Sequence, residues 1–298
     1  MQQVSTISVP SLRSTLAAYL NLMKPHVTVL LLGTTLAAMA VAIGGMPGAG
    51  VTLATLIAGA LAAGSANAIN CYWDRDIDRL MSRTRTRSLP AGRVSEMGAL
   101  IFGLAAGVVS CVIFAVFVNL LSALLALAAI LFYVGIYTMW LKRTTAQNIV
   151  IGGAAGAVPV LIGWAAVTNS ISVTSVLMFT IIFLWTPPHF WAVSLVLKKD
   201  YERAGVPMLP VVRGESETYR QILLYTVALI LASLALVATH AMGVLYLVTA
   251  LVLGAAFLGF VIHLLRTRTL RSARSLFWIS NNYLALLFAA MVLDRVLR

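Results

Sequence analysis

The sequence predicts an all-α integral membrane protein that crosses the bilayer nine times. Of its 298 residues, 61% are hydrophobic and 10% are charged, and the mean hydropathy is +0.96. This composition leaves too little polar sequence to cover a water-facing globule of that size. Nine apolar runs have roughly the 18 residues needed to cross the hydrocarbon core of a bilayer. The basic residues between these runs gather in alternate connections, as expected for a multi-pass protein.

Each apolar run is expected to be helical, because a lipid-facing backbone has no water to satisfy its amide and carbonyl groups. The third and fourth runs adjoin at Asn119, where one long kinked helix would change the count. We expect one membrane-embedded domain over 1–298, with a cytoplasmic segment at 1–23 that lacks the apolar core of a signal peptide. The runs lie near residues 26–44, 51–72, 97–118, 120–141, 147–167, 172–194, 220–239, 244–265 and 276–294.

The basic residues predict the orientation of the chain. Alternate connections, counted from the N-terminus, hold 19 of the 21 Lys and Arg residues and leave only Arg295 and Arg298 on the other side. The positive-inside rule therefore places the N-terminus in the cytoplasm. A net charge of +12 could suggest nucleic acid, but these charges lie in short loops between spans, so no nucleic acid is expected. Eight of the nine acidic residues fall in two of these connections, which follow the second and sixth spans.

The connection after the second span combines acidic and basic side chains. If the helix continues to its end, Asn70, Asp74 and Asp78 recur at i, i+4 and i+8 and share one stripe. Carboxylate and carboxamide oxygens suit Mg²⁺, which binds through one or two carboxylates plus substrate phosphates. Arginine supplies forked donors to phosphate oxygens, and four arginines follow: Arg79, Arg83, Arg85 and Arg87. A metal-bridged diphosphate is the natural ligand of such a cluster.

A purely structural interpretation of this cluster remains open. The arginines could anchor the loop at the membrane surface, and the aspartates could balance their charge. Three like charges within one and a half turns, however, repel one another unless a cation lies between them. Asp76 points away from the stripe, and we expect it to pair with Arg75 or Arg79.

The end of the sixth span carries the second polar cluster. Pro187 and Pro188 are expected to break or kink the helix there, since neither can donate to the backbone ladder. His189 would then lie near the break, as a functional group or as a hydrogen-bonded packing residue. Trp185 and Trp191 beside it could equally belong to the interfacial belt. Beyond it, Lys198, Lys199 and Asp200 could hold a second metal ion or the far side of a diphosphate.

A third connection brings further polar groups to the same face. Lys142 and Arg143 precede Asn148, which is a candidate ligand contact at the start of the fifth span. Gly152 and Gly153 follow it and permit close approach of a neighbouring helix.

Four sequence blocks resemble the UbiA-type intramembrane prenyltransferases, and in particular the members that act on protohaem. They are NCYWDRDID continuing into RLMSRTRTRSLPAGRVS, then KRTTAQNIVIGGAAGAVPVLIGW, TPPHFWAVSL and DYERAGVPMLPVV, within residues 67–213. Two departures stand out. Many relatives carry a second paired-aspartate motif where this chain has Asp200 with two lysines and Glu202. The common Arg-Pro-Leu-Pro stands here as Arg-Ser-Leu-Pro, at residues 87–90.

The resemblance implies a farnesyltransferase in a bacterial-type plasma membrane, with its active face in the cytoplasm. Its substrates would be farnesyl diphosphate and protohaem IX (haem B, a substrate rather than a cofactor), its cofactor Mg²⁺ and its product haem O. Membrane lipid and a downstream haem-handling membrane enzyme are the expected partners. The implied residues are Asn70, Asp74 and Asp78 as the catalytic groups; the same three with Asp200 for the metal; Arg83, Arg87, Lys142, Asn148, Lys198 and Lys199 for the diphosphate; and His189, Trp185 and Tyr201 on the haem side.

Three other functions stay open at this point. The nearest is a prenyltransferase of the same family with an aromatic acceptor such as 4-hydroxybenzoate. A transporter is less consistent with the sequence, because transporters place ionisable groups near mid-membrane and these spans hold almost none. A non-enzymatic assembly factor is the third.

Overall fold

The computed structural model describes residues 11–298, and in that part of the chain nine helices are long and apolar enough to cross a membrane. The prediction of nine spans is therefore confirmed, and the protein is a multi-pass membrane protein. Residues 1–10 of the expected segment 1–23 lie outside the described residues, and α1 (Leu12–Leu22) follows them. The spans are α2 (Pro25–Ile43), α3 (Ala49–Trp73), α5 (Glu96–Phe117), α6 (Leu120–Leu131) continued by the π-helical η1 (Phe132–Leu141) and α7 (Lys142–Thr144), α8 (Asn148–Thr168), α9 (Val173–Val196), α12 (Gly214–Ala235) continued by the 3₁₀ turn η2 (Leu236–Thr239), α13 (Val244–Thr267) and α14 (Leu270–Val296).

Asn119 separates α5 from α6, so these are two helices rather than one kinked helix. Its side-chain oxygen accepts a hydrogen bond from Ser122 N at 2.8 Å, which caps α6. Its amide nitrogen donates to the carbonyl oxygen of Ala165 on α8, also at 2.8 Å. One side chain therefore begins a helix and ties it to a neighbour.

Of the break or kink expected at Pro187 and Pro188, the break is wrong, because α9 runs without interruption to Val196. Both prolines are buried, and α9 packs against α8, α12 and α14. Proline withdraws a backbone donor, but in a membrane helix the neighbouring helices can hold the segment together. The second polar cluster consequently begins at the end of α9, a turn and more beyond the prolines.

Close helix approach at the start of α8 is confirmed. A Cβ atom added to Gly152 would lie 2.2 Å from the Tyr137 side chain, and one added to Gly153 would lie 2.8 Å from Thr186. Further along α8, a Cβ on Gly163 would lie 2.2 Å from the backbone oxygen of Thr35 on α2. Only glycine permits these contacts, and they hold α8 in the middle of the bundle.

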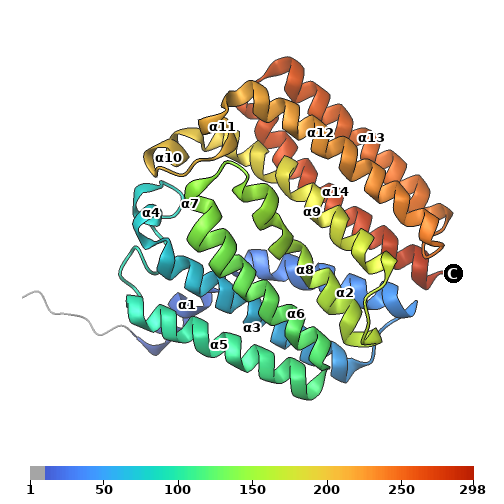
Figure 1. Cartoon of the computed structure of the whole chain (residues 1–298), viewed down its shortest axis with the longest axis horizontal. Coiled ribbons are helices and arrows are strands. Elements are labelled where there is room, and N and C mark those ends of the chain that lie inside the picture. Colours follow the sequence, from blue (N-terminus) through green and yellow to red (C-terminus); the bar gives the residue numbers. More distant parts are fainter. Residues whose placement is uncertain (1–10) are drawn as a thin grey trace, which may run out of the picture.

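Three short helices gather at one end of the bundle: α4 (Arg75–Leu80), α10 (Lys198–Arg203) and α11 (Leu209–Val212) (Figure 1). We call this end the basic face. A buried apolar cluster joins its two longest connections, and it comprises Ile77, Met81, Ile149, Tyr201, Val206 and Met208. Ser82, after α4, also donates from its backbone nitrogen to Asp200 at 3.2 Å. The two acid-rich connections, far apart in sequence, therefore pack on each other.

Candidate functional site

Asn70, Asp74 and Asp78 lie on one stripe, although the helix is interrupted at Asp74. α3 ends at Trp73 and α4 begins at Arg75, with Asp74 between them at ψ 10°. The i to i+4 backbone bonds nevertheless continue, from Asp74 N to Asn70 O at 2.9 Å and from Asp78 N to Asp74 O at 2.8 Å. All three side chains are buried, with relative exposures of 4%, 1% and 2%. Buried carboxylates need charged or hydrogen-bonding partners.

Asn70 lies between a cation and a carboxylate. Lys24 Nζ donates to Asn70 Oδ1 at 2.9 Å, and Asn70 Nδ2 donates to Asp74 Oδ2 at 2.7 Å. The same amide nitrogen donates to Thr138 Oγ1 at 3.2 Å. Because Oδ1 is the only atom of the amide that could bind a metal, Asn70 in this arrangement orients Asp74 rather than presenting a free ligand.

Cations from three separate elements surround the two carboxylates. Lys142 Nζ forms an ion pair with Asp74 Oδ2. Arg87 Nη1 contacts both oxygens of Asp78, at 3.1 and 2.9 Å. Lys24 is the third, and its pKa is lowered to about 8, chiefly by burial and also by the nearby charges of Arg87 and Lys142. With three cations beside two carboxylates, the cluster has an excess positive charge that suits an anionic ligand.

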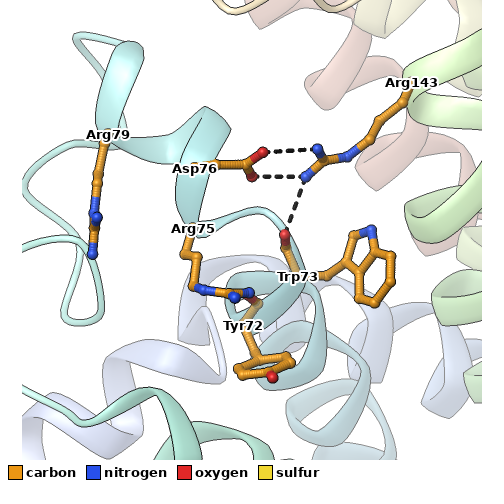
Figure 2. Close-up of a pocket in the computed structure, with 6 residues that line it drawn as sticks. All are labelled: Tyr72, Trp73, Arg75, Asp76, Arg79 and Arg143. Atoms are coloured by element: carbon orange, nitrogen blue, oxygen red, sulfur yellow. Dashed lines mark hydrogen bonds and ion pairs between the residues drawn. The ribbon is translucent and has the colours of Figure 1, made fainter.

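The predicted partner of Asp76 is wrong. Its carboxylate accepts two hydrogen bonds from Arg143, at 2.7 and 2.8 Å, and the hydrogen bonds from Arg143 lower the pKa of Asp76 to about 2 (Figure 2). Arg75 and Arg79 turn instead to Glu96, at 2.8 and 3.7 Å. Arg143 is brought to Asp76 by the fold, because 67 residues separate them in sequence.

The carboxylates fit a divalent cation of the Mg²⁺ type. Asp74 Oδ1 is buried and makes no hydrogen bond within the described chain, and Arg143 Nη2 lies 3.6 Å away. Among residues 11–298, no three His, Cys, Asp or Glu side chains form a metal-binding group. Mg²⁺ takes one or two carboxylates and completes its shell with water and phosphate oxygens. Asp74 and Asp78 are the residues that could supply these oxygens.

Asp200, the other expected metal ligand, is engaged elsewhere. Its carboxylate accepts hydrogen bonds from the backbone and hydroxyl of Ser82 and lies 3.7 Å from Arg203. In this structure it ties the two acid-rich connections together. A role in metal binding stays a prediction.

The residues expected to bind diphosphate fall into two groups. Arg87 and Lys142 belong to the cluster around Asp74 and Asp78, as described above. The others do not contact that cluster: Arg83 and Lys199 are exposed, Lys198 pairs with Glu215 at 3.1 Å, and Asn148 donates to the Thr145 carbonyl at 2.6 Å. The buried Oδ1 of Asn148 makes no hydrogen bond within the described residues.

On the expected haem side, His189 has a packing arrangement. Its ring lies between Trp185 and Phe277, with centroids at 4.2 and 4.6 Å, and Nδ1 shares a 2.7 Å hydrogen bond with Ser280 Oγ. Trp185 Nε1 donates to the Ser280 carbonyl at 2.7 Å. Tyr201 lies in the buried cluster that joins the two connections. Trp191 is 1% exposed, so the alternative that it belongs to the interfacial belt is wrong.

Sequence reasoning missed Lys24 and Thr138 as members of the cluster. Lys24 entered only the count of basic residues that predicts the orientation of the chain. Its position directly before Pro25, at the start of the first span, was the signal that could have marked it as a candidate site residue. It adopts φ 50°, an uncommon conformation for a residue other than glycine. Thr138 lies inside the fourth apolar run, where nothing in the sequence distinguishes it.

Taken together, the bundle and its cluster define an intramembrane protein with two buried carboxylates and several cations gathered at one end of its helices. The profile of the UbiA prenyltransferase family matches residues 31–287, and the chain belongs to that family. It is 54% identical to the "Protoheme IX farnesyltransferase" of Symbiobacterium thermophilum, over 93% of each chain. It is 51% identical to the protein of that name from Gloeobacter violaceus, over 97% of this chain and 95% of that one.

Solved structures share the fold at low sequence identity. A digeranylgeranylglyceryl phosphate synthase gives a TM-score of 0.80 at 17% identity and covers 95% of this chain and 99% of its own. A UbiA homologue from Archaeoglobus fulgidus, bound to DMAPP and Mg²⁺, gives 0.66 at 16% identity and covers 92% and 98%. These likenesses extend the family fold to almost the whole chain.

Proposed function

We propose that this protein transfers a farnesyl group from farnesyl diphosphate to a vinyl group of protohaem IX, giving haem O. The observation that carries the proposal is the identity of about one half with relatives named for this reaction, over nearly the full chain. The cluster at the end of α3 is chemically suited to it, because buried carboxylates and surplus cations match a magnesium diphosphate.

Asp74 and Asp78 would hold Mg²⁺, and Lys24, Lys142 and Arg87 would donate to phosphate oxygens. When bound, Mg²⁺ supplies positive charge against the diphosphate. As the allylic C1–O bond breaks, negative charge grows on the leaving oxygens, and preorganised cations in a dry site stabilise it strongly. Asn70 holds Asp74 in place through its 2.7 Å hydrogen bond.

Burial of the site protects the allylic cation that forms when diphosphate leaves. The allylic cation left after ionisation would react with water, so the site must exclude bulk water until C1 has bonded to the vinyl group. That bond leaves a cation on the other vinyl carbon, to which one water molecule adds, so that the product carries a hydroxyl group and diphosphate and a proton are released. Asn70, Asp74 and Asp78 are almost fully buried at the end of a membrane helix, and apolar spans enclose them. Both substrates join an apolar body to charged groups, so a site open to a basic face and lined below by apolar helices can receive them.

The setting of the reaction is also part of the proposal. We place the protein in a bacterial plasma membrane with the basic face in the cytoplasm, because that face carries nearly all the Lys and Arg residues. A membrane enzyme that handles haem would then receive the product.

One assay tests the proposal directly. Purified protein in nanodiscs is incubated with protohaem, farnesyl diphosphate and Mg²⁺, and porphyrins are analysed by mass spectrometry. A heavier, farnesylated porphyrin is expected, which should be absent when Mg²⁺ is chelated. A parallel reaction offers 4-hydroxybenzoate as acceptor. Prenylation of that acceptor with unmodified protohaem would reject the haem assignment and keep the family chemistry.

A further inference from the structure

A cavity lies beside the candidate site, on the other side of the α3–α4 junction. It has a volume of about 390 Å³ and is lined by Tyr72, Trp73, Arg75, Asp76, Arg79 and Arg143 (Figure 2). None of the residues assigned to the metal or the diphosphate lines it. Since residues 72, 76 and 79 share one helical face and residues 70, 74 and 78 share another, the two sites use different sides of the same segment.

The cavity carries a surplus of fixed positive charge. Three guanidinium groups line it, and two carboxylates pair with them: Asp76 with Arg143, and Glu96 with Arg75 and Arg79. Arg143 is held by Asp76 and by the Trp73 carbonyl at 3.1 Å. Arg75 is held by the Tyr72 carbonyl at 2.8 Å and by Glu96, and its guanidinium lies 4.7 Å from the centre of the Tyr72 ring. Each guanidinium has five N–H donors, so these contacts orient the groups and leave donors for an anion.

Arg79 is the least constrained of the three. Its side chain is 61% exposed, and its contact with Glu96 is 3.7 Å long. It can therefore turn toward a ligand without breaking a strong interaction, because exposed ion pairs contribute little to stability.

The position of the cavity indicates the kind of anion. α3 is a membrane span that ends at Trp73, so the cavity lies at the level where hydrocarbon gives way to head groups. Trp73 is 37% exposed there, and tryptophan and tyrosine favour this level of a bilayer. Glu96 begins α5, whose Met97 and Ile101 are exposed on the membrane side. An anionic head group with an apolar tail fits both features.

We propose that this cavity binds the phosphate head group of an anionic phospholipid from the leaflet at the basic face. The three guanidinium groups would donate to its phosphate oxygens, and Trp73 with the exposed side chains of α5 would contact its acyl chain. Arg143 lies 3.6 Å from Asp74, so it links the lipid site to the candidate metal site. The proposal concerns this cavity alone and does not depend on the reaction at the neighbouring site.

Native mass spectrometry of the purified full chain tests the proposal with phosphatidylglycerol as the probe. We expect wild-type protein to bind phosphatidylglycerol in preference to phosphatidylcholine. The double substitution Arg75→Gln with Arg79→Gln should weaken phosphatidylglycerol binding by about 5-fold per arginine, since a basic residue near a membrane surface is worth about 1 kcal/mol toward anionic lipid. Arg203→Gln with Arg220→Gln, two exposed arginines of the same face outside the cavity, is the matched control and should leave the binding unchanged.

Arg79→Glu serves as a second variant that should fold normally, because Arg79 is exposed and weakly paired. It should lower phosphatidylglycerol affinity while leaving the thermal unfolding temperature unchanged. Undiminished phosphatidylglycerol binding in both variants would overturn the proposal. So would displacement of the lipid by inorganic phosphate at equal concentration, which would indicate a site for free phosphate. A loss of protohaem affinity with unchanged lipid binding would assign the cavity to the haem propionates instead.

Discussion

Lys24, Asn70 and Asp74 form a chain of hydrogen bonds in which each side chain fixes the next. The ammonium group of Lys24 has only donors, so it must meet the carbonyl oxygen of Asn70. The amide nitrogen of Asn70 is thereby directed at Asp74. A lysine that begins the first span thus sets the orientation of a carboxylate at the end of the second.

Replacing Lys24 by methionine should therefore reduce catalysis. The substitution keeps the length of the side chain and removes its charge, which frees the Asn70 amide and withdraws one donor to the diphosphate. A hydrogen bond to a charged group contributes about 1.5–3 kcal/mol, so kcat/KM for farnesyl diphosphate should fall roughly 10- to 100-fold. Steady-state assays measure this change, with Arg13→Met on α1 as the control. An unchanged kcat/KM would exclude Lys24 from the site.

Asp74 and Asp78 are expected to be individually essential. Asp74→Asn keeps the shape of a buried side chain but removes the charge that would hold Mg²⁺, and product formation should fall at least about 100-fold, as when a strong electrostatic group is lost from an active site. Asp78→Asn should behave similarly.

The matched control for both aspartates is Glu202→Gln, an exposed acidic residue in the other acid-rich connection. It should retain wild-type turnover. Raising the Mg²⁺ concentration should partly restore a variant with weakened metal binding. Near-normal turnover of Asp74→Asn at low Mg²⁺ would show that the carboxylate is not a metal ligand.

At the scale of the helices, apolar length is what the sequence predicts well. Each span has to be helical and long enough to cross the bilayer, whatever its neighbours are. The fate of Pro187 and Pro188 was not predictable in the same way, because it depends on the helices that pack around α9. The same is true of Asp76, whose partner arrives from η1 and α7 through the fold.

The close contact of α8 with α2 gives a test of helix packing. A methyl group at Gly163 would lie 2.2 Å from the backbone oxygen of Thr35, so Gly163→Ala should force the two helices apart. Overpacking of this kind typically costs about 1–3 kcal/mol. We expect a lower unfolding temperature in detergent, measured by circular dichroism.

Gly156→Ala in the same helix is a matched control, since a Cβ there meets nothing within 4 Å. Alanine is the better helix former by about 1 kcal/mol, so this variant should be neutral or slightly more stable. If the two substitutions had equal effects, α8 would not lie against α2 as described.

For the whole molecule, the distribution of charged residues predicted that the candidate site lies at one face. The structure shows which of these charged side chains contact one another there. Sequence spacing alone brought Asn70, Asp74 and Asp78 together, since the i to i+4 backbone bonds continue from α3 through Asp74 into α4. It could not show that Lys24, Arg87 and Lys142 converge on them, because these come from three elements that meet only in the folded bundle. Asp200 stands where many relatives carry a second paired-aspartate motif. In this structure its carboxylate accepts a hydrogen bond from Ser82 and so joins the two acid-rich connections.

The orientation of the bundle is the remaining prediction at this scale. Ala91 lies in an exposed loop of the basic face, and Ser170 is exposed in the turn between α8 and α9, at the other end of the spans. Cys71 and Cys111 are the only cysteines of the chain, so replacing both by alanine gives a background for single labels. In intact spheroplasts, a membrane-impermeant maleimide should label Ser170→Cys and leave Ala91→Cys unlabelled until the membrane is opened. The physical reason is that 19 of the 21 basic side chains would otherwise have to be moved across the bilayer. The reverse labelling pattern would place the diphosphate site outside the cell, away from a cytoplasmic supply of its substrate.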